Sequence, residues 1–177
     1  MQNEKAHKDI VLEQFDILEV IEKNVSLARF APWGELDIDM PRQPEVLVRS
    51  NRLLMSQVIG NLLTNAAESI IAADRRPGRV AIAVTQDATN TVTISIADDG
   101  KGFEPDMGAE LFMRGHSSKK GRAGGLGLHW CANTIKAMGG TLTLQSDGPG
   151  KGARAVIVLS GRQGDSALTD HRPGLAA

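Results

Sequence analysis

The 177-residue chain has few cysteines, no excess of basic charge and no long apolar run. Its single cysteine, Cys131, excludes an internal disulfide, and its four scattered histidines have no zinc-ligand spacing. The formal net charge of -1 lacks the strong basic excess that is typical of a general nucleic-acid-binding surface. No apolar run approaches the roughly 20 residues of a membrane-spanning helix, and no signal peptide opens the chain. We therefore expect a cytoplasmic globular domain that contacts neither nucleic acid nor membrane.

The chain does contain an alternation of helical and extended patterns. One helix is expected to open at Asp16, which forms a capping box with Glu19, and to run to about Phe30. Further helices are expected from Ser50 or Asn51 to about Ala73 and over 125–138, whereas residues 4–14 are only compatible with a helix. Strands are expected at 35–40, 46–48, 79–85, 91–97, 141–146 and 153–159, the third and fourth as a hairpin. This order predicts an α+β fold with helices on one face of a mixed sheet.

The stretch from Gln57 to Ser69 is expected to form a helix with two distinct faces. Its apolar residues recur at three- and four-residue spacings and predict a buried stripe: Val58, Leu62, Leu63, Ile70 and Ile71. Asn61 and Asn65 are four residues apart, so their side chains stack one turn apart on another face. Asparagine competes for backbone hydrogen bonds inside a helix, which suggests that this pair has a function. Taken alone, such a pair is more often a solvated helix face.

The second half of the chain is rich in glycine, with most of the 19 glycines between residues 100 and 152. Asp98, Gly100 and Gly102 follow a predicted strand, where glycines let the backbone turn sharply or a ligand approach closely. The Asp98 carboxylate could accept a hydrogen bond from an exocyclic amine such as that of adenine. The alternative is a plain Asp-Gly turn.

A long loop is expected at 103–124, because this segment lacks a sustained period, and a loop of this length is usually functional, such as a lid. Lys119 and Lys120 within it could supply charge to a terminal phosphate, although loop lysines are more often solvated. The run after the loop opens the next helix, whose free N–H groups attract phosphate: Gly124, Gly125, Leu126, Gly127 and Leu128. The alternative for this run is a flexible loop end.

The order of the motifs is more specific than any one of them: QxxxNLxxNAxE, DxGxG, LFxxGxSSK, GGLGL, then GG, a strand, GxG and a strand. Over about residues 16–160 the chain resembles the ATP-binding domain of histidine kinases. Its superfamily includes gyrase-type topoisomerases, heat-shock chaperone ATPases and mismatch-repair ATPases. The resemblance implies a two-layer α/β sandwich with a mainly antiparallel sheet at 15–160 and a lid at about 103–124. Residues 1–14 would then be a connector, the remnant of a dimerisation hairpin helix, and 161–177 a disordered tail.

The resemblance also implies a role for each motif residue toward ATP and Mg²⁺. Asn65 would coordinate Mg²⁺ between the phosphates, and Asn61 would hold the metal's water shell or a phosphate, both as oxygen ligands. Asp98 would accept the adenine amino group, and Gly100 and Gly102 would shape the base pocket.

The F box and lid correspond to Phe112 through Lys119, where Lys119 or its neighbour Lys120 would reach the γ-phosphate. Further residues implied to contact the nucleotide are Phe112, Ser118, Gly124, Gly125, Leu126, Gly127 and Leu128. The chain departs from the family pattern at Ala123, which occupies the position of the first glycine of the lid motif. It also departs at Ala153 and Arg154, where hydroxyl residues are usual. A water-mediated contact to adenine is therefore expected to be missing.

Asn61 stands where the hydrolytic branches of the superfamily carry a glutamate that activates water. Because an amide cannot act as a general base, we expect poor ATP hydrolysis and phosphate donation to an external nucleophile. Glu68 is interpreted as an exposed helix carboxylate without a base role.

The expected function is phosphoryl transfer from ATP to a histidine in two-component signalling, with a response regulator as a further partner. His7, the only upstream histidine, lies too near Asn61 to be the acceptor. We therefore expect the acceptor to lie on a dimerisation domain of the parent protein and the isolated domain to be monomeric. The alternatives are a serine kinase that inhibits a sigma factor and a regulatory pseudokinase; Asn65, Asp98 and the GLGL run argue against the latter. The signal, the cognate regulator and any membrane anchor of the parent stay open.

Overall fold

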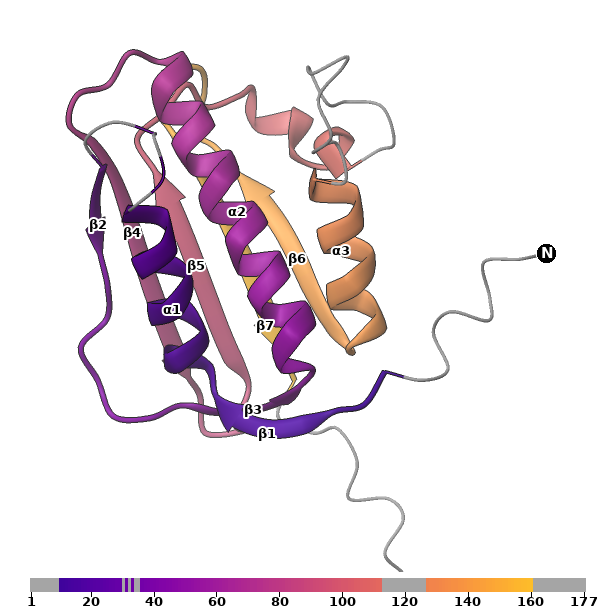
Figure 1. The fold of residues 1–177 in the computed structure, drawn as a ribbon. Coiled ribbons are helices and arrows are strands. Elements are labelled where there is room, and N and C mark those ends of the chain that lie inside the picture. The colour runs from indigo at the N-terminus through magenta and orange to yellow at the C-terminus, as the bar shows by residue number, and fades with distance from the viewer. Residues whose placement is uncertain (1–9, 30, 32, 34–35, 113–126, 161–177) are drawn as a thin grey trace, which may run out of the picture.

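The computed structural model of the protein describes residues 10–29, 31, 33, 36–112 and 127–160. Three helices lie side by side on one face of a five-stranded sheet (Figure 1). They are α1 (Ile17–Arg29), α2 (Arg52–Ala72) and α3 (Gly127–Ala137). This arrangement confirms the expected two-layer α+β sandwich.

The main sheet has the strand order β2-β4-β5-β7-β6. Its strands are β2 (Leu36–Asp39), β4 (Gly78–Gln86), β5 (Val92–Asp98), β6 (Gly140–Gln145) and β7 (Ala153–Leu159). The pair β2–β4 is parallel, and the other three pairs are antiparallel. The predicted hairpin, β4–β5, and the mixed, mainly antiparallel character of the sheet are both confirmed.

A separate two-stranded sheet joins β1 (Glu13–Asp16) to β3 (Leu47–Ser50) in antiparallel register. The helical expectation for 4–14 is therefore wrong at Glu13 and Gln14, which pair with residues far along the chain. Asp16 does cap α1, since its Oδ1 accepts hydrogen bonds from the N–H groups of Leu18 and Val46, both at 3.0 Å. Glu19, the other residue of the expected capping box, instead forms an ion pair with Arg52 at 3.0 Å.

Helix α2 is the central helix of the layer and packs against both α1 and α3. Asn51 is its N-cap, and the Asn51 side chain accepts a hydrogen bond from Leu54 N–H at 2.9 Å. Its core-facing residues are Met55, Val58, Ile59, Leu62, Leu63, Ala66, Ala67 and Ile70. Ile71 is 50% exposed, so its assignment to the buried stripe is wrong. The stripe of Ile59, Leu63 and Ala67 is buried, but its continuation at Ile71 falls in the last turn of α2 and is exposed.

The first part of the expected loop at 103–124 is structured. Residues 105–112 form two short 3₁₀ helices, Pro105–Gly108 and Glu110–Phe112. The remainder of the predicted lid lies outside the described residues, as do most of the connector at 1–14 and the tail at 161–177. Within the part of the chain that the structure describes, no helix is both long and apolar enough to cross a membrane.

Candidate functional site

Asp98 reaches the helix layer because of its place on β5. The residues Val92, Ile94 and Ile96 are buried beneath the helices, and Asp98 continues their two-residue period. Its backbone pairs with Ala153 of β7 at the end of the strand. The carboxylate therefore lies at the edge of the core, beside the C-terminal end of α2.

Two hydrogen bonds fix the Asp98 carboxylate at this edge. Its Oδ1 accepts from the Ser69 hydroxyl at 3.0 Å and from Gly100 N–H at 2.9 Å. Burial raises the pKa of Asp98 above its ordinary value. The hydrogen bonds from Gly100, Ser69 and Ala153 N–H act against this rise, and the charge of Asp99 adds to it. The carboxylate is thus a hydrogen-bond acceptor held in one orientation.

The glycines after Asp98 allow the backbone to pack against its neighbours. A Cβ at Gly100 would lie 2.5 Å from the carbonyl carbon of Ser69, so any side chain at this position would overlap the backbone of α2. Gly102 has a φ of +60°, and a Cβ there would lie 2.4 Å from the carbonyl oxygen of Gly148. Gly152, with a φ of +75°, packs equally closely on the backbone of Asp98. These glycines interlock β5, α2 and the β6–β7 connection around the carboxylate.

The Ser146 hydroxyl contacts backbone groups on both sides of this glycine-rich region. Its hydroxyl oxygen lies 2.7 Å from Gly152 O and accepts a hydrogen bond from Phe103 N–H at 3.1 Å. It also accepts from Gly148 N–H at 3.2 Å. One side chain therefore joins the segment after β5 to the turn before β7.

The predicted metal-binding pair lies nearer the middle of α2, with both side chains partly exposed. Among the described residues, Asn65 Nδ2 is a buried side-chain atom without a hydrogen-bond partner. A buried amide nitrogen left unpaired is costly, so Asn65 is a candidate ligand-binding residue. Asn61 hydrogen-bonds the Cys131 thiol of α3, whose pKa is raised to about 12 by burial, an effect that this bond opposes. Cys131 is thus a buried residue of α3.

Helix α2 thus carries both ends of the candidate site. Asn61 and Ser69 are eight residues apart, which corresponds to about 12 Å along the helix axis. Asp98 meets the helix at Ser69, and Asn61 and Asn65 follow toward its middle.

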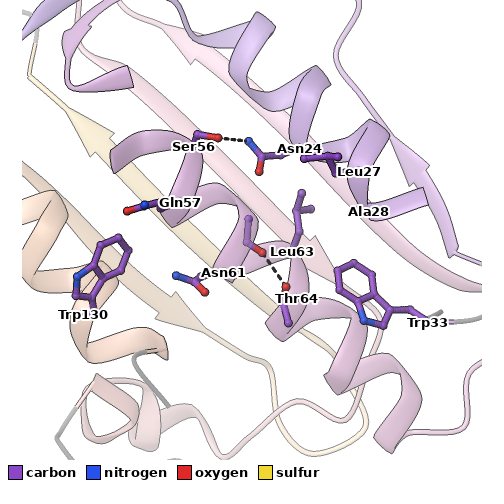
Figure 2. A pocket seen from close by; sticks show the side chains of 11 residues that line it. Asn24, Leu27, Ala28, Trp33, Ser56, Gln57, Asn61, Leu63, Thr64 and Trp130 are labelled. Carbon is purple, nitrogen blue, oxygen red and sulfur yellow. Dashed lines mark hydrogen bonds between the residues drawn. The ribbon is translucent and has the colours of Figure 1, made fainter. Parts of the chain in front are cut away.

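A groove of about 750 Å³ runs along α2 beside Asn61. Figure 2 shows Trp130 of α3 and Trp33 on opposite sides of the α2 segment that carries Asn61 and Thr64. The groove is lined by Asn24, Leu27, Ala28, Trp33, Ser56, Gln57, Gly60, Asn61, Leu63, Thr64 and Trp130. None of these described lining residues is ionisable. Asp98 is not among them, so the groove lies at the Asn61 end of the candidate site.

The described flanks of the predicted lid lie close to each other. His129 of α3 lies 2.9 Å through Nδ1 from the carbonyl oxygen of Phe112, and 2.9 Å through Nε2 from the Asn133 amide. Leu128 and Phe112 both pack partly buried against the core. Among the described residues, nothing lies within 4 Å of a Cβ placed at Gly127, the first residue of α3.

Several predicted contact residues lie outside the described residues: Ser118, Lys119, Lys120, Gly124, Gly125 and Leu126. We call the Asp98 end of the candidate site the base end, because Asp98 is the predicted adenine acceptor. Two residues that organise this end, Ser69 and Ser146, were not identified from the sequence. Their hydroxyls bond to segments far along the chain, and a single serine in a helix or strand gives no periodic signal. In the described part of the chain, no group of three or more His, Cys, Asp or Glu could hold a metal ion.

Residues 50–163 match the family model of the histidine kinase-, DNA gyrase B- and HSP90-like ATPases. The chain belongs to this family. The match covers both asparagines of α2, Asp98 and the glycine motifs that follow. The resemblance to histidine kinase ATP-binding domains is thereby confirmed at the level of the family.

The relatives of the chain are bacterial sensor kinases. It is 32% identical over 147 residues to the C4-dicarboxylate transport sensor protein DctB of Pseudomonas aeruginosa, covering 81% of this chain and 23% of that protein. It is 30% identical over 157 residues to the sensor histidine kinase ZraS of Klebsiella oxytoca, covering 86% of this chain and 33% of that protein. The chain therefore spans about a quarter to a third of these relatives' length.

A solved structure supports the same assignment. The mycobacterial sensor histidine kinase MprB aligns with a TM-score of 0.70 and 26% identity, covering 86% of this chain and 99% of that chain. The catalytic domain of histidine kinase ThkA aligns with a TM-score of 0.68 at 19% identity, which shows a shared fold alone. Together with the sensor kinase relatives, the likeness to MprB favours a histidine kinase domain over the two alternative functions.

Proposed function

We propose that this chain binds ATP with Mg²⁺ and is the catalytic part of a cytoplasmic sensor histidine kinase module. The γ-phosphate would pass to a histidine on a dimerisation domain of the parent protein and from there to a response regulator. The observation that carries the proposal is the unpaired, buried amide of Asn65, on the same helix as the Ser69–Asp98 contact. A nucleotide that lies along α2 would hydrogen-bond to the Asn65 amide at one end and to the Asp98 carboxylate at the other.

The residues present fit a magnesium nucleotide. An asparagine offers an amide oxygen, which is a ligand class that Mg²⁺ prefers, and an amide nitrogen that can donate to a phosphate oxygen. In this proposal Asn65 uses both atoms, and Asn61 contacts the metal's waters or a phosphate. When bound, Mg²⁺ would neutralise charge on the phosphates during transfer. The N-terminus of α3, at Gly127, would accept a phosphate.

Transfer to a protein side chain is favoured over hydrolysis by the chemistry of Asn61. An amide has no basic lone pair to take a proton from water, so nothing at this position would activate a water molecule. The catalytic work of the chain would be to position the γ-phosphate and stabilise its charge. Lys119 and Lys120 would add positive charge at the terminal phosphate.

The acceptor would approach through the groove that begins at Asn61. Its walls are uncharged, and Trp33 and Trp130 provide large apolar surfaces on either side. A surface of this kind accommodates the apolar face of a helix. A helix laid there would bring its histidine next to the candidate phosphate site.

The test is transfer of label from γ-³²P-ATP to a supplied acceptor hairpin, followed by acid treatment. We expect an acid-labile phosphohistidine with the wild-type chain and loss of labelling with Asn65→Ala. Gln86→Ala, which removes an exposed amide side chain at the far end of β4, is the matched control and should keep the activity. Unchanged transfer by Asn65→Ala would contradict the metal assignment. Acid-stable label would support the serine kinase instead.

A further inference from the structure

We propose that Ser69 is a positioning residue that makes the base pocket selective for adenine over a base with a carbonyl at C6. This inference rests on the proposed function, because it assigns Asp98 to the base. The Ser69 hydroxyl would hold the carboxylate of Asp98 so that the second oxygen, Oδ2, faces the exocyclic amine. The residue itself would not touch the nucleotide.

The position of the Ser69 hydroxyl differs from that of another hydroxyl on the same helix. Thr64 Oγ1 donates to the carbonyl of Gly60 at 2.9 Å, which is the usual local bond of a mid-helix hydroxyl. Ser69 Oγ instead crosses from α2 to β5 and donates to Asp98 Oδ1 at 3.0 Å. Ser69 is therefore used for a tertiary contact at the site.

A second hydrogen bond fixes the direction in which Ser69 donates. Lys101 N–H donates to the same hydroxyl oxygen at 3.1 Å and occupies one of its acceptor positions. The hydroxyl proton is then left to point at Asp98. Because Gly100 N–H also donates to Oδ1, the bonds from Ser69 and Gly100 share one oxygen of the carboxylate, and the carboxylate also receives a hydrogen bond from Ala153 N–H. Oδ2 takes part in neither the Ser69 nor the Gly100 bond.

Strand β7 does not supply an equivalent hydroxyl. Ala153, the β7 residue paired with Asp98, carries only a methyl side chain. Ser69 is thus the side-chain hydroxyl bonded to Asp98 in the described part of the chain. Removing it would leave the carboxylate held by backbone N–H groups alone.

The chemistry of the base then determines selectivity. Adenine presents an amine at C6, which donates to a fixed carboxylate oxygen, whereas hypoxanthine presents a carbonyl that would face the carboxylate without a proton. A site built to accept a hydrogen bond discriminates strongly against a base that lacks the donor. If Asp98 could rotate, this discrimination would weaken.

The first test compares ATP and ITP binding to the full chain by isothermal titration calorimetry with Mg²⁺ present. We expect Ser69→Ala to lower ATP affinity by about fivefold and ITP affinity much less, so the ATP/ITP ratio falls by about fivefold. Ser69→Thr keeps the hydroxyl and should restore most of the ratio. Ser95→Ala, on the open face of β5, is the matched control and should leave both affinities unchanged.

The second test needs no nucleotide. The Ser69 hydroxyl stabilises the ionised carboxylate, so Ser69→Ala should raise the pKa of Asp98 further, as measured by NMR of the side-chain carboxyl carbon. An equal loss of ATP and ITP affinity would show a merely structural role and overturn the proposal, as would an unchanged ratio or an unchanged pKa. If the wild-type chain binds no ATP, the proposed function fails, and the selectivity proposal fails with it. If it binds ATP and only the variants behave otherwise, the proposed function stands.

Discussion

The two ends of the candidate nucleotide site are built in opposite ways. At the base end, hydrogen bonds from Ser69, Gly100 and Lys101 interlock the backbone before any ligand is present. At the phosphate end, the amide of Asn65 is buried and unpaired among the described residues. In our proposal, the base end is thus ordered by the fold itself, whereas the phosphate end is stabilised only when a ligand arrives.

The largest expected effect is a loss of stability caused by a substitution at the base end. Gly152→Ala should lower the free energy of unfolding by about 3–5 kcal/mol, because a Cβ there overlaps the Asp98 backbone and φ is +75°. Gly150 has the same φ, but a Cβ there would meet nothing within 4 Å. Gly150→Ala should therefore cost only about 1–2 kcal/mol. Urea denaturation of both variants measures the difference, and equal losses would show that close packing at Gly152 is unimportant.

A smaller effect on stability, of opposite sign, is expected from a substitution at the phosphate end. Asn65→Leu replaces a buried unpaired amide by an apolar side chain of similar size. It should raise the free energy of unfolding of the ligand-free chain by about 1 kcal/mol, since no hydrogen bond is lost, while abolishing ATP–Mg²⁺ binding. Thermal unfolding and calorimetry measure the two effects. A large loss of stability would contradict the interpretation that this amide lacks a partner in the free protein.

The smallest effect is a pH dependence at the base end. Because the folded pKa of Asp98 is raised above 3.8, the folded state binds this proton more tightly than the unfolded chain does. The stability that Asp98 contributes is therefore greatest below pH 3.8 and falls as pH rises through the folded pKa. Relative to Asp98→Asn, the wild type should lose stability over that window. Urea denaturation at a series of pH values tests this, and an opposite slope would contradict a raised pKa.

The local parts of the fold could be predicted from the sequence. Periodicity and capping gave the three helices, and alternation gave the hairpin, because these signals depend on residues that are close in the chain. The pairing of Glu13 and Gln14 with β3 could not be predicted, since a short polar strand gains its stability from a distant partner. Ile71 was misplaced because the stripe of Ile59, Leu63 and Ala67 to which it belongs is buried only up to the last turn of α2.

The candidate site was predictable in its motifs and not in its supporting contacts. The order of Asn61, Asn65, Asp98 and the glycines is visible in the sequence. The function of Gly100 is not, because its close contact is with the backbone of α2, on a segment 30 residues earlier. The hydroxyls of Ser69 and Ser146 likewise depend on packing between distant segments.

Hydrogen–deuterium exchange of three amides most directly tests the contrast between the two ends. The N–H groups of Gly100, Lys101 and Gly152 are hydrogen-bonded within the interlocked base end. We predict that they are protected in the ligand-free chain and change little when ATP and Mg²⁺ are added. Fast exchange in the free chain, with protection only on nucleotide binding, would contradict a base end that is ordered before the ligand arrives.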